Sequence, residues 1–247
     1  MLEDFLNATA EHFEELRRRI IYAAVAILLA TAVAFIFSDQ ILRLLVLPSG
    51  GLQLKAFGIM DGFMIKWRLA LYAGIVMAFP VWAYQVYAFI SPGLYDNERR
   101  AVFPPLVAAM LLFVIGTLFG YYLLWGMIRV LIQIFPQQVE FFPAADAYIS
   151  FVVFFLLACG LAFQLPTFLM ILAQLHLVSA TLLRKQRRIA YFALFAFAEI
   201  ITPVADPIVA PLTIMVPLIL LYELSIWLVV RIEVGRKQAE IKAAGSS

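Results

Sequence analysis

The residues best suited to ionic chemistry lie in two short segments beside long apolar runs. The first segment, EHFEELRRRI, holds His12, Glu14, Glu15 and three arginines just before the first run. An amphipathic helix anchored at a membrane surface would explain these arginines. It does not explain the carboxylates of Glu14 and Glu15, because acidic side chains are unfavourable beside anionic lipid headgroups.

The second segment, FISPGLYDNERRA, connects two apolar runs and opens on the turn signal Pro92-Gly93. Glu98 and Arg99 follow within the same connection. The simpler interpretation is a solvated connector with Glu98 at a helix N-terminus, because most charged loop residues are merely solvated. A binding role for Glu98 is the alternative, and the local sequence does not decide between them.

The composition indicates that lipid surrounds the elements carrying these residues. Of 247 residues, 65% are hydrophobic and 14% charged, and the mean hydropathy is +0.97. A soluble domain has about 45–50% apolar and a quarter charged residues, and a chain of this length cannot bury such an excess within itself. Open strands are excluded in lipid, so we expect an all-α integral membrane protein. The single cysteine, Cys159, excludes an internal disulfide framework.

Six apolar runs approach the roughly 20 residues that a helix needs to cross the hydrocarbon core. The runs cover residues 20–37, 69–90, 102–128, 149–175, 189–201 and 211–230. They predict a single six-span membrane domain over residues 1–232 with short fifth and sixth spans, followed by a polar cytoplasmic tail over 233–247. We expect this tail to be frayed, with an amphipathic juxtamembrane helix over its first part as the alternative. Prolines within the runs predict kinked helices and a concave arrangement.

The distribution of Lys and Arg predicts that both termini lie in the cytoplasm. With the N-terminus inside, the cytoplasmic segments hold 13 of the 18 Lys and Arg residues. Positive residues favour the cytoplasmic side, and two cytoplasmic termini require an even number of spans, as six provides.

Several motifs follow one another in order along nearly the whole chain. They read HFEELRRR at 12–19, FISPGLYDNER at 89–99, FVIGTLFGYY at 113–122 and PLILLYELSI at 217–226, with Thr202-Pro203 and Asp206-Pro207 before the last. In this combination the chain resembles the TatC family of twin-arginine protein translocase subunits.

This resemblance implies a glove-like fold and a receptor that binds twin-arginine signal peptides and supports export of folded proteins. Glu15 and Glu98, with their neighbours Arg17 and Arg99, would face the signal peptide's paired arginines. A guanidinium–carboxylate pair can be bidentate and charge-assisted, and lysine would not substitute equally.

The resemblance also implies a location in the cytoplasmic (inner) membrane and protein export that is driven by the proton-motive force. The implied partners are TatA- and TatB-type single-span subunits, the signal peptides of folded passengers, the lipid bilayer and further copies of this chain. Neither a cofactor nor nucleic acid is expected, and the sequence carries no phosphate-cradling Gly-rich loop.

Three further polar residues stand in or near the apolar runs. Gln164 occupies a position where many family members have glutamate, so we expect it to form hydrogen bonds and not to carry a proton. Asp206, in the last outer connection, is expected at a turn or helix cap; family members commonly have glutamine where Ala210 follows. Glu223, inside the last run, is expected to form a helix-packing hydrogen bond that Tyr222 shares.

Two other function classes, a secondary transporter and an intramembrane hydrolase, have their own sequence signatures. A secondary transporter commonly shows inverted repeats and a midplane site, and no repeat relates the first three runs to the last three. An intramembrane hydrolase would need a catalytic pair or metal motif, and no HExxH, GxSxG or GxGD occurs. We therefore expect no enzymatic activity, and a secondary transporter or a non-catalytic membrane assembly factor stays open as the alternative.

Overall fold

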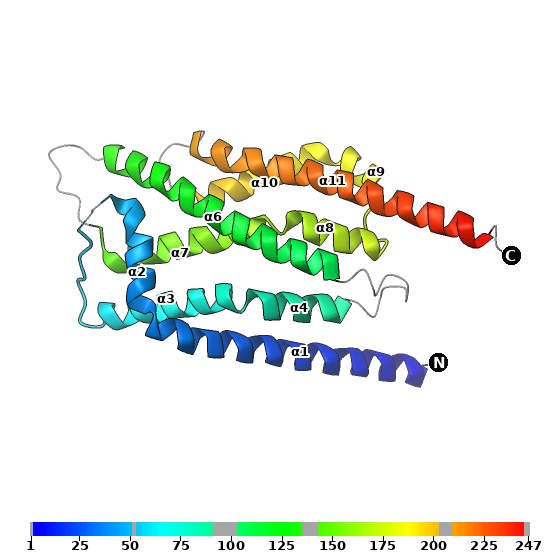
Figure 1. Cartoon of the computed structure of the whole chain (residues 1–247), viewed down its shortest axis with the longest axis horizontal. Coiled ribbons are helices and arrows are strands. Elements are labelled where there is room, and N and C mark those ends of the chain that lie inside the picture. The colour runs from blue at the N-terminus through cyan, green and yellow to red at the C-terminus, as the bar shows by residue number, and fades with distance from the viewer. Residues whose placement is uncertain (1, 51–52, 91–102, 135–142, 203–208, 245–247) are drawn as a thin grey trace. The chain divides into compact units, whose positions relative to one another are not determined.

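The computed structural model describes residues 2–50, 53–90, 103–134, 143–202 and 209–244 (Figure 1). Within these ranges every regular element is helical: α-helices and one 3₁₀ turn, Leu47–Ser49. The prediction of an all-α protein is thus confirmed for the described residues. The chain divides into two compact units, unit 1 (Met1–Met110 with Phe135–Leu157) and unit 2 (Leu111–Ile134 with Ala158–Ser247).

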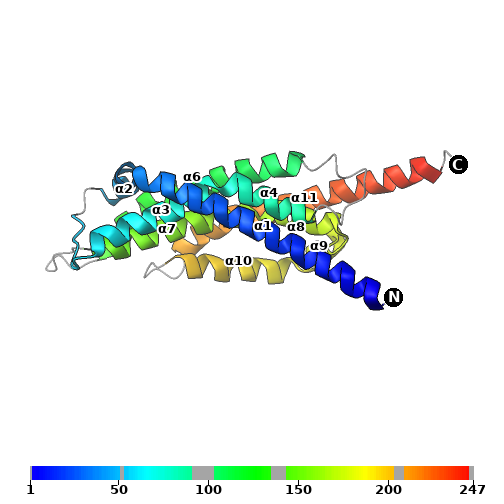
Figure 2. The ribbon, with the colours of Figure 1, turned by 90° about the horizontal axis from the view of Figure 1, so that it is seen from below.

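Unit 1 is built on a long first helix, α1 (Leu2–Ile36), which packs along α3 (Asp61–Met77) and α4 (Phe79–Ile90) (Figures 1 and 2). α1 and α3 approach closely where Gly74 of α3 faces Thr31 of α1. The buried Thr31 hydroxyl donates to a carbonyl one turn earlier on α1 (2.7 Å), so it needs no partner across the interface. Small residues at such contacts let membrane helices pack backbone to backbone.

The second apolar run folds as two helices, α3 and α4, that are bent by 51° where they meet at Ala78. Pro80, at the start of α4, has no N–H for the helical hydrogen-bond ladder, which breaks here. The indole N–H of Trp82 donates to the Ile75 carbonyl (3.1 Å) and so links the two helices across the bend. The kink predicted from Pro80 is therefore confirmed.

The first part of α7 (Ala145–Ala162) completes unit 1 and is held to it by polar contacts. Arg68 of α3 donates to Asp146 in the first turn of α7 (3.0 Å). The Tyr148 hydroxyl donates to a carbonyl of α2 (Ser38–Val46), again at 3.0 Å. These contacts satisfy charges and backbone groups near the ends of three helices.

Unit 2 contains most of α6 (Phe103–Ile134) together with α8 (Leu165–Gln174), α9 (Ala180–Lys185), α10 (Arg187–Ile201) and α11 (Val209–Ala244). Its buried core lies where α8, α9 and α11 meet and is formed by Leu169, Ala173, Ala180, Leu183, Tyr222, Ile226 and Val229. α6 and the end of α7 come close at Gly116, where an added Cβ would lie 2.7 Å from the Phe163 side chain. The core of unit 2 thus fixes α11 against the short helices.

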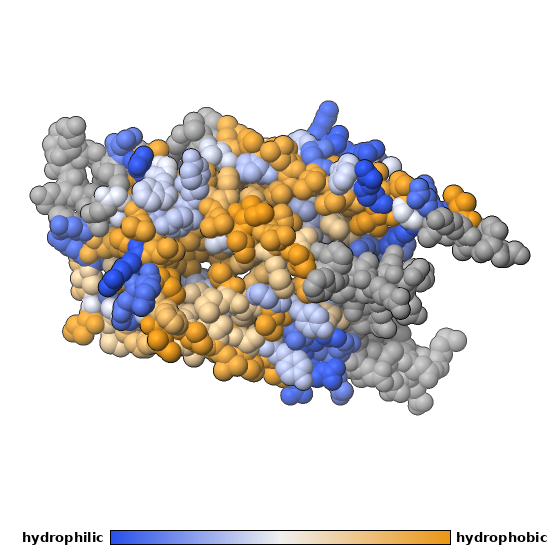
Figure 3. Space-filling view, in the orientation of Figure 1, coloured by the Kyte–Doolittle hydropathy of each residue, from blue (hydrophilic) through white to orange (hydrophobic). Residues whose placement is uncertain are grey.

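Four helical segments among the described residues are long and apolar enough to cross a membrane. They are Phe13–Ile36, Leu106–Val130, Ala145–Gln174 and Pro211–Gln238, and the bent pair α3–α4 makes a fifth. Apolar side chains cover much of the visible helix surface in Figure 3, as lipid contact requires. α10 has 15 residues, or about 22 Å at 1.5 Å per residue, and is shorter than the hydrocarbon core. That α10, the predicted fifth span, crosses the membrane therefore stays a prediction, and so does the total of six spans.

The last helix differs from its prediction. The sequence predicted a short sixth span over 211–230 and a frayed tail over 233–247, but α11 continues without a break to Ala244. The segment after residue 232 is rich in residues with high helix propensity, and side chains within it bind the α8–α9 connection. The helix therefore extends beyond the predicted span, and of the two interpretations that the sequence left open for the first part of the tail, the helix is present as far as Ala244.

Candidate functional site

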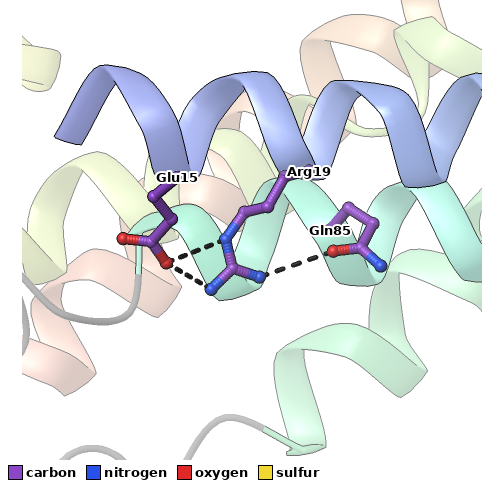
Figure 4. Close-up of polar contacts among 3 residues, drawn as sticks. All are labelled: Glu15, Arg19 and Gln85. Atoms are coloured by element: carbon purple, nitrogen blue, oxygen red, sulfur yellow. Dashed lines mark hydrogen bonds and ion pairs between the residues drawn. The ribbon is translucent and has the colours of Figure 1, made fainter. Parts of the chain in front are cut away.

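Glu15 of α1 forms an ion pair with Arg19, one helical turn further on. The Nε and Nη2 of Arg19 both donate to Glu15 Oε1, at 3.0 and 2.5 Å (Figure 4). Spacing of four residues places both side chains on one face of the helix. The two side chains are 26% and 20% exposed, so the pair is shielded from bulk water more than an ordinary surface pair.

The same guanidinium reaches a second acceptor on a different helix. Arg19 Nη1 donates to Gln85 Oε1 of α4 at 3.4 Å, a long and weaker hydrogen bond (Figure 4). Because α1 packs against α4, one arginine lies between a carboxylate and an amide from two elements.

An apolar groove of about 440 Å³ lies beside this pair. It is lined by Leu16, Arg19, Ile20, Ala23 and Ile27 of α1 and by Trp82, Gln85, Val86 and Phe89 of α4. Trp82 is held in place by its hydrogen bond to Ile75 and by an edge-on contact with Phe79, with ring centroids 4.7 Å apart. A charged group and an apolar surface are therefore adjacent along the α1–α4 contact.

The other residues predicted for ionic binding are distributed as follows. Glu98 and Arg99 lie outside the described residues, and so does Asp206 of the last outer connection. Arg17 is exposed on α1, two residues from Glu15, and residues with that spacing do not face each other on a helix. The structure thus pairs Glu15 with Arg19 rather than with Arg17.

Gln164 stands at the break between α7 and α8, where its side chain does not cap α8. It lines an apolar pocket of about 370 Å³ together with Leu161, Ala162, Leu165, Phe168, Leu194, Phe197 and Leu218. The backbone carbonyl of Gln164 accepts a hydrogen bond from the N–H of Phe168 in the first turn of α8 (2.9 Å). The amide of Gln164 is therefore placed at the rim of an almost wholly apolar hollow.

Glu223 of α11 binds two side chains of α10. Its Oε2 accepts from Arg187 Nη2 (2.5 Å) and its Oε1 accepts from the Tyr191 hydroxyl (2.6 Å). Tyr222, expected to share in the Glu223 contact, instead donates to the Leu183 carbonyl at 2.9 Å. The network joins the start of the short helix α10 to the middle of α11.

Sequence reasoning missed Gln85, Arg187 and Tyr191 as partners of these carboxylates. Arg187 and Tyr191 are four residues apart, which is a signal for one polar helix face. Gln85 carries no such signal, because only the packing of α4 on α1 brings it to Arg19.

The end of α11 also makes polar contacts that the sequence did not predict, through Glu233 and Arg236. Glu233 Oε1 accepts from the Ala180 N–H at the start of α9 (2.9 Å). Arg236 donates to the carbonyls of Ala173 and Gln174 at the end of α8, at 3.1 and 2.6 Å. Backbone groups at helix ends lack partners within the helix, so these two side chains stabilise the α8–α9 turn.

We expect Arg236→Ala to loosen this turn and to destabilise the chain by about 1–3 kcal/mol, because two carbonyls lose a charged donor. Hydrogen–deuterium exchange of peptides covering residues 175–183 should become faster. Lys237→Ala, at the exposed neighbouring position, is the matched control and should leave exchange unchanged. Equal exchange in both variants would show that the contact does not hold the turn.

Comparison with known proteins agrees with this architecture. The family model described as Sec-independent protein translocase protein (TatC) matches residues 11–217. The Sec-independent protein translocase protein TatC of Deinococcus radiodurans is 37% identical over 225 residues, covering 87% of this chain and 83% of that protein. The protein of the same name from Carboxydothermus hydrogenoformans is 32% identical over 230 residues, covering 92% and 94%.

Solved structures of similar proteins also match this chain. A crystal structure of the twin arginine translocase receptor TatC superposes with a TM-score of 0.75 at 32% identity, covering 88% of this chain and 97% of that one. A second, of the same receptor in DDM, gives 0.78 at 31% identity, covering 88% and 98%. This chain belongs to the TatC family of Sec-independent protein translocase proteins.

Proposed function

We propose that this chain is the receptor and core subunit of a twin-arginine protein translocase. It binds the twin-arginine signal peptides of folded passenger proteins and supports their export across the cytoplasmic (inner) membrane. The family membership supports this proposal, and so does the similarity to crystal structures of a protein described as the twin arginine translocase receptor.

One observation carries the proposal: the Glu15 carboxylate stands beside an apolar groove on the same pair of helices. A secretory signal peptide has a positively charged segment followed by an apolar one. The carboxylate suits an arginine of the first segment, and the groove suits side chains of the second. A guanidinium also matches the geometry of a carboxylate better than an ammonium does, which favours arginine over lysine.

Glu98 supplies the second carboxylate in this proposal, with Arg17 and Arg99 shaping the charge around it. The support is the pair of motifs HFEELRRR and FISPGLYDNER, which place Glu15 and Glu98 before the first span and in the first connection on the same predicted side. Two carboxylates would allow both arginines of the signal to be bound at once.

The remaining parts of the proposal concern topology and partners. Both termini lie in the cytoplasm, as the 13 of 18 basic residues on that side favour. TatA- and TatB-type single-span subunits and further copies of the chain complete the complex, and the proton-motive force drives export without enzymatic chemistry in this subunit. Asp206 faces the outer side, and Gln164 contributes a hydrogen-bonding amide within the membrane.

The test is binding of a twin-arginine signal peptide to the full chain purified in detergent. Glu15→Gln and Glu98→Ala should each weaken binding by about tenfold or more, since removing one partner of a shielded charge pair costs about 2–5 kcal/mol. An Arg-Arg→Lys-Lys peptide should bind as poorly to the wild type. Glu14→Gln, at an exposed position one residue away, is the control and should bind like the wild type. Binding that ignores all of these changes would overturn the receptor proposal.

A further inference from the structure

Within the receptor function proposed above, we propose that Arg19 is a built-in competitor for the arginine-binding carboxylate. In the unbound chain its guanidinium occupies Glu15, and a signal-peptide arginine displaces it onto Gln85. Arg19 thereby lowers the affinity of the site for every cationic peptide that binds this carboxylate.

In the unbound chain the site already holds an arginine. Two donors of the Arg19 guanidinium converge on one oxygen of Glu15, Oε1, at 3.0 and 2.5 Å (Figure 4). An incoming guanidinium that binds in the bidentate manner needs both oxygens of the carboxylate, so it must displace Arg19 from Oε1. Bidentate binding is then an exchange of one arginine for another, and its free energy is the difference between the two contacts.

The displaced Arg19 side chain has a hydrogen-bond acceptor within reach. A guanidinium without an acceptor against the apolar groove would be costly, because its hydrogen-bonding groups would lose water without replacement. Arg19 Nη1 already touches Gln85 Oε1 at 3.4 Å, longer than a good hydrogen bond. A small rotation toward α4 shortens this contact while it vacates Glu15, so Gln85 stabilises the open position.

The preference for arginine over lysine belongs to the carboxylate itself, because arginine presents a rigid fork of donors whereas lysine offers a compact charge on a flexible stem. Both kinds of peptide bear the same cost of displacing Arg19. Removing the competitor should therefore strengthen the binding of both by the same factor and leave the ratio of their affinities unchanged.

Arg19 is the arginine singled out by the structure among the three in this segment. Arg17 and Arg18 are exposed, whereas Arg19 is 20% exposed and lines the groove. Arg18→Gln is therefore a matched control, because it removes the same charge from an exposed position of the same helix that does not line the groove. It accounts for the general attraction that a cationic peptide gains when any nearby positive charge is lost.

The experiment measures binding of Arg-Arg and Lys-Lys signal peptides to the full chain in detergent. Relative to Arg18→Gln, Arg19→Gln should bind the Arg-Arg peptide about threefold more tightly and the Lys-Lys peptide by the same factor. Gln85→Leu should weaken Arg-Arg binding more in the wild-type background than in the Arg19→Gln background. Arg19→Lys, which keeps the charge without the fork, should fall between the wild type and Arg19→Gln, and it provides the test if Arg19→Gln does not yield folded protein.

The outcomes separate the two proposals. If Glu15→Gln weakens wild-type binding but Arg19→Gln and Arg19→Lys bind the Arg-Arg peptide no more tightly than Arg18→Gln, the competitor role is overturned and the receptor stands. Weaker binding by the Arg19 variants would mean that Arg19 orients Glu15 for the ligand, which also overturns the competitor role. If the wild type binds no signal peptide, both proposals fall together.

Discussion

Replacing Gly74 by alanine is expected to destabilise unit 1 by about 1–3 kcal/mol, the usual cost of an extra methyl group in a packed contact. A Cβ at this position of α3 would lie 2.7 Å from the backbone N and Cα of Thr31 in α1. Backbone atoms in the interior of a long helix cannot move aside as the end of a flexible side chain can. α1 and α3 must therefore separate, and thermal unfolding of the full chain in detergent should show a Tm lower by roughly 2–10 °C.

Gly62→Ala is the matched control, because Gly62 lies on the same helix and an added Cβ there would meet nothing within 4 Å. Alanine is the better helix former, so this variant should melt at or slightly above the wild-type temperature. Two equal changes in Tm, or none at Gly74, would contradict the close approach of α1 and α3. Peptide binding by Gly74→Ala should also weaken, since α1 carries Glu15 and must lie correctly against α4.

The apolar runs predicted where most of the helices lie but not the residues at which most of them begin and end. The run over 69–90 corresponds to α3 and α4, yet α3 begins at Asp61, before two basic residues that were assigned to a connection. Those charges are satisfied by ion pairs, Lys66 with Asp39 and Arg68 with Asp146, so the helix includes them. An apolar run in the sequence indicates which residues can lie in contact with lipid. The helix itself extends further, as long as its backbone groups and charged side chains are hydrogen-bonded or paired.

The same limit explains the last helix. Hydropathy ends near residue 230, and the polar sequence beyond it suggested a tail. The contacts of Glu233 and Arg236 with the α8–α9 turn require tertiary structure, and no local pattern encodes them. Pro80 predicted a structural feature correctly where hydropathy did not. The N–H that proline lacks affects the hydrogen bonds of its own helix, so no tertiary contact is needed, and the bend beside Pro80 is present in the structure.

The candidate site was predictable to the extent that it depends on one helix. Glu15 and Arg19 are four residues apart, so their pairing follows from helical spacing. Gln85 is separated from them by most of unit 1, and only packing makes it a neighbour. Glu98 and Asp206 lie outside the described residues, and their roles rest on the family resemblance.

Loss of the Glu223 carboxylate is expected to be the most damaging change in unit 2. Glu223→Leu should destabilise the chain by about 1–3 kcal/mol or more, because a charged group whose partner is removed keeps its desolvation cost. Arg187 would lose the acceptor at 2.5 Å and Tyr191 the acceptor at 2.6 Å, so the short helix α10 would lose its polar contacts with α11. Thermal unfolding in detergent measures the change.

A second substitution separates the ion pair from simple packing. If the cost of Glu223→Leu comes from the isolated Arg187 charge, then adding Arg187→Leu should restore part of the lost stability, since no charge is then left without its partner. Arg188→Leu, at the exposed neighbouring position, should restore nothing in the same background. A double variant with Arg187→Leu that melts as low as Glu223→Leu alone would assign the loss to Tyr191 and to packing. Restoration by Arg187→Leu but not by Arg188→Leu would instead show that α10 is held to α11 through this one pair of charges.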